Sequence, residues 1–316
     1  MKVAVLKGGR SLERGVSLKS AARVEDALDA LGHETLPLDV GSDLVGRLRQ
    51  ERPEVAFIAL HGPGGEDGTV QELLEILGIP YTGPGVAACG RCMDKVAAKH
   101  ELREAGLPTP DWAAFNSTAF GELGAADALD EIEDRLAFPL VVKPAAQGSS
   151  LGVEFAADRA KVPAALVAAF SYDDRVLLER YVEGRELAVS VLGSEALPVV
   201  EALPRQEDFF NFEARYEIGR TEYVCPAELG SEETAEVQEI ALGTYETLGC
   251  SGFARVDLIL GEDGPTVLEV NAIPGLTDRS LMPMAAEAAG VEFEQLVERI
   301  IALALERPAG AATLPA

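Results

Sequence analysis

The chain has few of the residues that mark secreted, membrane or nucleic-acid-binding proteins. Four cysteines in 316 residues are too few for a disulfide scaffold, so we expect a reducing compartment, the cytoplasm. The longest uncharged stretch, residues 76–90, is interrupted by proline and glycine and does not predict a membrane span. The opening MKVAVL runs into Gly8-Gly9-Arg10, which favours a first buried strand over a signal peptide.

Basic residues are also scarce, with 27 lysines and arginines against 53 acids and a net charge of −26. Nucleic acids and anionic membranes need a basic surface, so neither is an expected partner. A nucleotide polyphosphate would be repelled by this field unless local Lys, Arg or Mg²⁺ overcame it. We therefore look for small-molecule substrates and for clustered cations.

The scarce cysteines and histidines do not predict a zinc site. Cys89-Gly-Arg-Cys92 matches Cys-x-x-Cys, but Cys225 and Cys250 lie far downstream with an unlike spacing. The three histidines have no zinc spacing either. The role of Cys89 and Cys92 is left open.

The chain divides into three predicted domains, residues 1–90, 91–180 and 181–316. In the first, apolar strands near 3–6, 34–38 and 55–60 alternate with helices such as 17–31, which predicts a parallel α/β sheet. The later blocks have an α+β character, with strands near 176–181, 186–192 and 197–202 and helices near 232–248, 281–289 and 293–306. The predicted fold class is α/β, with α+β character in the second and third blocks.

A hairpin near the end of the chain carries oxygen ligands. Two apolar strands flank Gly261-Glu-Asp-Gly264, and alternation places Glu269 and Asn271 on one face with Asp257 on the neighbouring strand. Carboxylate and amide oxygens suit Mg²⁺ that also binds nucleotide phosphates. The alternative is a hairpin whose polar residues only face water.

A second motif is the loop Lys143-Pro-Ala-Ala-Gln-Gly148-Ser149-Ser150-Leu-Gly152, which follows an apolar strand. Glycine lets backbone N–H groups approach phosphate oxygens, and Lys143 supplies charge. The loop is not a Walker P-loop, because the lysine precedes the glycines. The alternative is a flexible linker.

Together these motifs resemble the D-alanine–D-alanine ligase family of ATP-grasp enzymes over nearly the whole chain. The likeness also rests on Met-Asp-Lys95, on Glu179-Arg180 with Glu186, and on several further motifs. These are residues 8–17, 59–71, 80–85, 253–257 and 271–277. The resemblance implies an N-terminal domain followed by a two-subdomain ATP-grasp fold, with ATP between two antiparallel sheets, and a homodimer.

The resemblance also implies roles on the nucleotide side. Lys95 and Lys143 would neutralise phosphate charge, and the loop with Gly148, Ser149 and Ser150 would close over the γ-phosphate. Glu179 would hold the adenine amino group, with the backbone at Arg180 and Val182 nearby and Glu186 on the ribose. Two Mg²⁺ or Mn²⁺ ions would be held by Asp257, Glu269 and Asn271.

On the amino-acid side, the first D-alanine would be phosphorylated to an acyl phosphate and then attacked by the amine of the second, for peptidoglycan precursor synthesis. Arg255 and the Gly275 N–H would stabilise the oxyanion. Glu13 would pair with the first ammonium, alongside Val16 and His61. Ser280 and the Leu281 N–H would bind the second carboxylate. His61 would position substrate rather than transfer protons, the alternative being a purely structural histidine.

A lid is expected over residues 209–216, where Tyr216 would bond to Glu13 and Ser149 and Arg215 would contact ATP. Departures from the family pattern are Gly15, Asn211, Arg215, Ala272-Ile273 and Asp278-Arg279. The last pair leaves acceptor identity open, either another amino acid or D-lactate, although Tyr216 argues against D-lactate. A non-catalytic nucleotide-binding protein is the other alternative; the intact metal, lysine and Arg255 positions argue against it.

Overall fold

The computed structural model describes residues 1–124, 129–204 and 221–307. The first block is a parallel sheet of strand order β2-β1-β3, in which residues 3–6 of β1 and all of β3 are buried. A sheet covered on both faces reads as continuous apolar runs, which explains the early strand pattern. Its elements are β1 (Lys2–Lys7), α1 (Arg14–Ala30), β2 (Glu34–Asp39), α2 (Leu44–Glu51), β3 (Val55–Ile58), α3 (Thr69–Leu77) and α4 (Val86–Met93).

The second block is an antiparallel sheet of order β4-β7-β5-β6 with its own apolar core. Helix α8 packs on it through buried Val162, Ala165, Leu166 and Ala169, a helical spacing of three and four residues. The elements are α5 (Lys95–Glu104), β4 (Trp112–Asn116), α6 (Ser117–Glu122), α7 (Leu129–Leu136), β5 (Leu140–Pro144), β6 (Glu154–Ala156), η2 (Arg159–Lys161), α8 (Val162–Phe170) and β7 (Arg175–Arg180).

The third block is an antiparallel sheet of order β11-β10-β8-β12-β13, with β9 paired to β8. The predicted hairpin is confirmed, while the strand expected over 197–202 begins at Val200, because Pro198 cannot donate to the ladder. The elements are β8 (Arg185–Leu192), β9 (Glu195–Ala196), β10 (Val200–Pro204), β11 (Thr221–Val224), α10 (Ser231–Thr247), β12 (Phe253–Gly261), β13 (Gly264–Asn271), α11 (Leu281–Ala288) and α12 (Phe293–Glu306).

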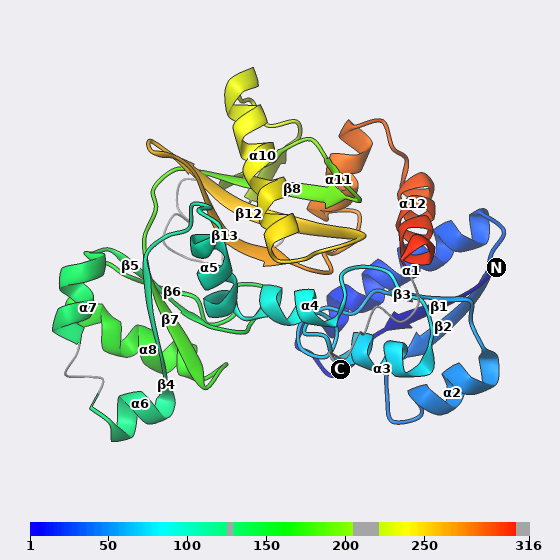
Figure 1. The fold of residues 1–316 in the computed structure, drawn as a ribbon, viewed down its shortest axis with the longest axis horizontal. Helices are drawn as coiled ribbons and strands as arrows, with labels where there is room; N and C mark the ends of the chain where they lie inside the picture. Colours follow the sequence, from blue (N-terminus) through cyan, green and yellow to red (C-terminus); the bar gives the residue numbers. More distant parts are fainter. Residues whose placement is uncertain (125–128, 205–220, 308–316) are drawn as a thin grey trace.

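The end of the chain returns to its beginning. Helix α12 lies against α1, as Figure 1 shows, and the Arg23 guanidinium lies 3.7 Å from the centre of the Phe293 ring. One continuous core therefore joins the first and third blocks, while the second block projects with a separate core. The three sheets lie within residues 2–58, 112–180 and 185–271. In the described part of the chain, no helix has the length and apolarity to cross a membrane.

Candidate active site

A cavity of about 610 Å³ lies between the two antiparallel sheets. Every predicted site residue in the described part of the chain lines it, so residues from all three blocks meet in one space. Arg215, Tyr216 and the expected lid lie outside the described residues. The predicted residues that line the cavity are Glu13, Val16, His61, Lys95, Lys143, Gly148, Ser149, Ser150, Glu179, Arg180, Val182, Glu186, Arg255, Asp257, Glu269, Asn271, Gly275, Ser280 and Leu281.

The cavity lining includes a buried carboxylate, Glu179, that pairs with two lysines. The Glu179 Oε2 atom lies 2.5 Å from Lys143 Nζ, and its Oε1 pairs with Lys99 Nζ. The Lys99 and Glu179 side chains are 1% and 3% exposed. Burial alone would raise the pKa of Glu179, but the two ammonium groups outweigh it and lower that pKa. Glu179 is therefore held ionised inside the protein.

Lys99 is a buried partner of the cavity residue Glu179 that the sequence reasoning missed. It lies one helical turn after Lys95 on α5, a four-residue spacing that places both lysines toward the same region. Lys99 Nζ also donates to Thr109 Oγ1 at 2.7 Å and to the Pro110 carbonyl at 3.1 Å. Burial lowers the pKa of Lys99 to about 8, even though Glu179 opposes that shift.

Lys95 connects the phosphate loop to the hairpin. Its position is fixed by the start of α5, where the Asp94 carboxylate caps the helix by accepting from the Val96 and Ala97 N–H groups. Lys95 Nζ donates to the Gln147 carbonyl at 2.6 Å and lies 3.1 Å from Glu269 Oε2. One ammonium group thus joins Gln147 of the phosphate loop to Glu269 of the hairpin, 122 residues later in the sequence.

The hairpin brings the three predicted metal ligands together. Asp257 is paired in register with Glu269, and Arg255 with Asn271. Arg255 forks onto Asp257 through Nε and Nη2, both at 2.7 Å. Burial raises the pKa of Asp257 despite Arg255, whereas Lys95 and Lys143 outweigh burial and lower the pKa of Glu269.

These residues fit a hard divalent cation. The buried Asn271 Oδ1 has no hydrogen-bond partner among the residues that the structure describes, and an orphaned amide oxygen beside two carboxylates suits Mg²⁺ or Mn²⁺. Within the same described ranges, no three His, Cys, Asp or Glu side chains gather as a metal site.

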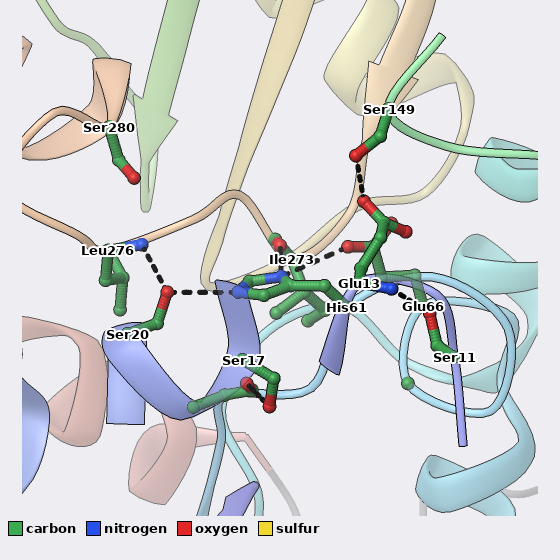
Figure 2. Close-up of polar contacts among 12 residues, drawn as sticks. Ser11, Glu13, Ser17, Ser20, His61, Glu66, Ser149, Ile273, Leu276 and Ser280 are labelled. Atoms are coloured by element: carbon green, nitrogen blue, oxygen red, sulfur yellow. Dashed lines mark hydrogen bonds and ion pairs between the residues drawn. The ribbon is translucent and has the colours of Figure 1, made fainter. Parts of the chain in front are cut away.

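The phosphate loop approaches the first block through Glu13. The Ser149 hydroxyl donates to Glu13 Oε1, as Figure 2 shows. Ser149 and Ser150 have φ values of 49° and 53°, a left-handed conformation that is costly for residues with a side chain. A Cβ on Gly148 would lie 3.0 Å from Glu13 Oε2, so glycine permits this close approach.

Glu13 has an acceptor available for a substrate. Its buried Oε2 has no hydrogen-bond partner in the described ranges. Burial raises the pKa of the Glu13 carboxyl, and the neighbouring Glu66 carboxylate raises it further. An ammonium group at this position would supply the missing donor and favour the ionised carboxylate.

His61 belongs to a relay that fixes the loop after β13. Its Nδ1 lies 3.0 Å from the Ile273 carbonyl, which can only accept, so we assign the ring proton to Nδ1. Its Nε2 then accepts from the Ser20 hydroxyl at 3.1 Å, and Ser20 Oγ accepts from the Leu276 N–H at 3.1 Å. Figure 2 shows this chain of contacts. His61 therefore contacts residue 273 directly and residue 276 through Ser20. Gly275 lies between these two positions.

Replacing Ser20 by alanine is expected to lower kcat and stability together, because a buried N–H and a ring nitrogen each lose a partner, at about 1–3 kcal/mol. Ser17→Ala is the matched control. Ser17 is equally buried, accepts from the Gly8 N–H and donates to the Ala59 carbonyl, but does not touch residues 273–276. The Tm of thermal unfolding should fall in both variants, whereas kcat should fall mainly in Ser20→Ala. An equal loss of kcat in the two variants would contradict the role of Ser20 and His61 in fixing residues 273–276.

The predicted acceptor end lies at the start of α11. The Thr277 N–H donates to Ser280 Oγ at 2.9 Å, and Leu281 begins the helix, where backbone N–H groups favour an anion. Asp278, whose charge put acceptor identity in doubt, lies 3.1 Å from Arg23 Nε and is 89% exposed. Arg279 lines the cavity, whereas Asp278 does not. Of these two departures from the family pattern, only Arg279 therefore contributes a charge to the cavity lining.

Comparisons with known proteins identify the family of this chain. Family models described as the N-terminus and the C-terminus of D-ala D-ala ligase match residues 41–84 and 102–302. D-alanine–D-alanine ligases of Synechococcus sp. (strain JA-3-3Ab) and Syntrophotalea carbinolica are 43% and 44% identical, over 98% and 95% of this chain and 95% of each relative. The chain belongs to the D-alanine–D-alanine ligase family. The predicted family is confirmed.

Solved structures of the family confirm the predicted fold class. D-alanine–D-alanine ligase from Bacillus anthracis has a TM-score of 0.84 at 36% identity, covering 96% of this chain and 97% of that one. Its complex with ATP has a TM-score of 0.83 at 34% identity, with the same coverage. The VanG D-Ala:D-Ser ligase from Enterococcus faecalis has a TM-score of 0.82 at 29% identity, covering 96% and 99%.

Proposed function

We propose that this chain joins two D-alanines to D-alanyl-D-alanine, using ATP and releasing ADP and phosphate. The observation that carries the proposal is the single cavity in which the lysines, the oxygen ligands, Glu13 and Arg255 meet. The curated relatives carry this ligase name, and the ATP complex of the Bacillus anthracis relative supports ATP as the nucleotide.

On the nucleotide side, Glu179 would accept from the adenine amino group, next to the backbone of Arg180 and Val182, with Glu186 on the ribose. Asp257, Glu269 and Asn271 would hold two Mg²⁺ or Mn²⁺ ions, which supply charge neutralisation at the phosphates. With a cation held by these carboxylates, Arg255 and Lys95, which pair with Asp257 and Glu269 in the structure, would be available for the substrate. Lys95, Lys143 and the Gly148–Ser150 backbone would then orient the phosphates.

On the amino-acid side, a carboxylate oxygen of the first D-alanine attacks the γ-phosphorus, and ADP leaves as the acyl phosphate forms. Glu13 holds the ammonium group of this substrate, beside Val16 and His61. The amine of the second D-alanine, placed by Ser280 and the Leu281 N–H, then attacks the acyl carbon. Arg255 and the Gly275 N–H stabilise the resulting oxyanion, and phosphate leaves with formation of the amide. Arg215 and Tyr216 remain proposed lid contacts.

A second acceptor deserves a parallel test because one structural relative is a D-Ala:D-Ser ligase. Arg279 lines the cavity at the acceptor end, where an added cation could change which amino acid binds best. D-alanine remains the main proposal, since the curated relatives are named for it.

The deciding experiment measures ADP release with D-alanine and Mg²⁺, together with mass detection of the dipeptide. We expect D-alanyl-D-alanine, formed in a one-to-one ratio with ADP, and no product when the metal is chelated. Mixtures of D-alanine with D-serine or D-lactate, scored for mixed products, decide between acceptors. ATP binding without any ligated product from these pairs would contradict the proposal.

We propose a cytoplasmic homodimer that supplies a peptidoglycan precursor, and domain limits near residues 90 and 180. Light scattering of the purified chain gives the oligomeric state; a monomeric mass at micromolar concentration would remove the dimer. Limited proteolysis that cleaves first near the proposed limits would support the domain division.

A further inference from the structure

Two thiols from distant parts of the sequence face each other at the edge of the cavity, whose lining includes Cys92. Cys92, in the last turn of α4, and Cys250, which follows α10, have their Sγ atoms 3.5 Å apart. The motif partner Cys89 instead directs its Sγ toward the Pro84 carbonyl, also at 3.5 Å. The structure thus pairs Cys92 across 158 residues rather than within Cys-x-x-Cys.

The surroundings hold this pair together. On the same helix, Arg91 Nη1 donates to the Leu248 carbonyl at 3.0 Å, so α4 is already tied to the segment that carries Cys250. A disulfide needs sulfurs about 2.05 Å apart, so the two Sγ atoms would have to approach each other by roughly 1.5 Å. Cys92 is buried and Cys250 is half-buried, so a soluble reagent reaches Cys250 first.

We propose that Cys92 and Cys250 are a disulfide-forming site, which a small-molecule disulfide oxidises and which slows the ligase when closed. The Cys250 thiolate attacks one sulfur of the reagent, whose S–S bond breaks and releases one thiol. The Cys92 thiol then loses its proton and attacks the Cys250 sulfur, releasing the second thiol. Two protein thiols are oxidised, and one reagent disulfide is reduced to two thiols that take both protons.

The link would act on the reaction through Lys95. Cys92 lines the cavity and lies three residues before Lys95, whose ammonium group contacts Gln147 and Glu269. A covalent bond from Cys92 to Cys250 fixes the start of α5 relative to β12, which begins three residues after Cys250. Small misplacements of positioning groups cost large factors in rate, so we expect kcat to fall roughly tenfold.

The test treats the full-length protein with oxidised glutathione and counts free thiols by maleimide labelling after denaturation. The four free thiols should fall to two in the wild type, with no glutathione retained. Cys250→Ser has three thiols, and none of them should form a disulfide with another. Any thiol that reacts in this variant should retain glutathione. Cys225→Ser, which removes a half-buried cysteine outside the cavity lining, should still lose two.

Activity is measured on the same samples before and after dithiothreitol. The roughly tenfold loss should appear in the wild type and in Cys225→Ser, be reversed by dithiothreitol, and be absent in Cys250→Ser. Loss of two thiols in Cys250→Ser without retained glutathione would place a link between two of the remaining cysteines and overturn the proposal. So would a full thiol count after oxidation, or unchanged kcat in the linked protein. The thiol count is independent of the ligase reaction, so an enzyme inactive when reduced would contradict only the proposed function.

Discussion

Arg255→Ala is expected to lower kcat by roughly 10²–10³ while the Kd for ATP changes little, because the lost guanidinium acts on an oxyanion that exists only during ligation. The measurement pairs steady-state ligation with ATP titration of the same sample. Arg255→Lys keeps a charge but loses the fork onto Asp257, so an intermediate rate is expected. Arg299→Ala, which removes a surface partner of Glu195, is the matched control.

Arg255→Ala also removes the ion pair with Asp257. The pH dependence of kcat separates this effect from the loss of oxyanion stabilisation. Arg255 opposes the raised pKa of Asp257, so its loss should raise that pKa further. A protonated Asp257 would bind metal poorly at low pH, whereas at high pH the carboxylate recovers its charge. If the defect in Arg255→Ala disappears at high pH, the guanidinium serves Asp257 and the oxyanion role is wrong. A defect that persists across pH supports the oxyanion role.

Local patterns in the sequence predicted the elements and the ligand set of the hairpin. Strand alternation and a Gly-Glu-Asp-Gly turn determine which side chains share a face, so Glu269 and Asn271 were placed from neighbours in sequence alone. The expected strand at 197–202 began late for an equally local reason, Pro198. The family resemblance added the chemical roles, which spacing alone does not contain.

Contacts that depend on distant segments could not be predicted in this way. Ser20 reads as an ordinary helix residue until its hydroxyl lies between His61 and the Leu276 N–H. Asp278 suggested a new charge in the acceptor site, but its carboxylate is exposed and pairs with Arg23 of α1. Cys92 lies beside Cys250 where Arg91 of α4 donates to the Leu248 carbonyl, just after α10. Each contact depends on packing between blocks.

The Lys99–Glu179 contact, which lies within the second block, also joins distant segments, and Lys99→Met is expected to lower the free energy of unfolding by about 3 kcal/mol, the low end for a broken buried pair. The low end applies because Lys143 still compensates Glu179. The same change should weaken ATP binding. With Lys99 absent, Lys143 is needed at Glu179 and is less available to phosphate.

A double-mutant cycle with Glu179→Gln separates stability from binding. In Lys99→Met/Glu179→Gln the buried charge is gone along with its partner, so much of the lost stability should return. ATP affinity should not return, because the proposed acceptor for the adenine amino group has been changed. Chemical denaturation of the wild type, the two single variants and the double variant gives the cycle for stability. ATP titration of the same four proteins gives the cycle for binding. Recovery of ATP affinity in the double variant would contradict the role assigned to Glu179.

The lowered pKa of Lys99 makes the same argument testable by pH alone. Burial lowers the pKa of Lys99 to about 8 in the folded protein, from an ordinary value of 10.5. Between these values the unfolded chain holds more protons, so this group's contribution to stability rises with pH. ATP binding should move the opposite way and weaken above about pH 8, because neutral Lys99 leaves Glu179 to Lys143. Lys99→Arg keeps its charge through this range and should flatten the ATP profile. Parallel weakening in both proteins would assign the pH effect to another group.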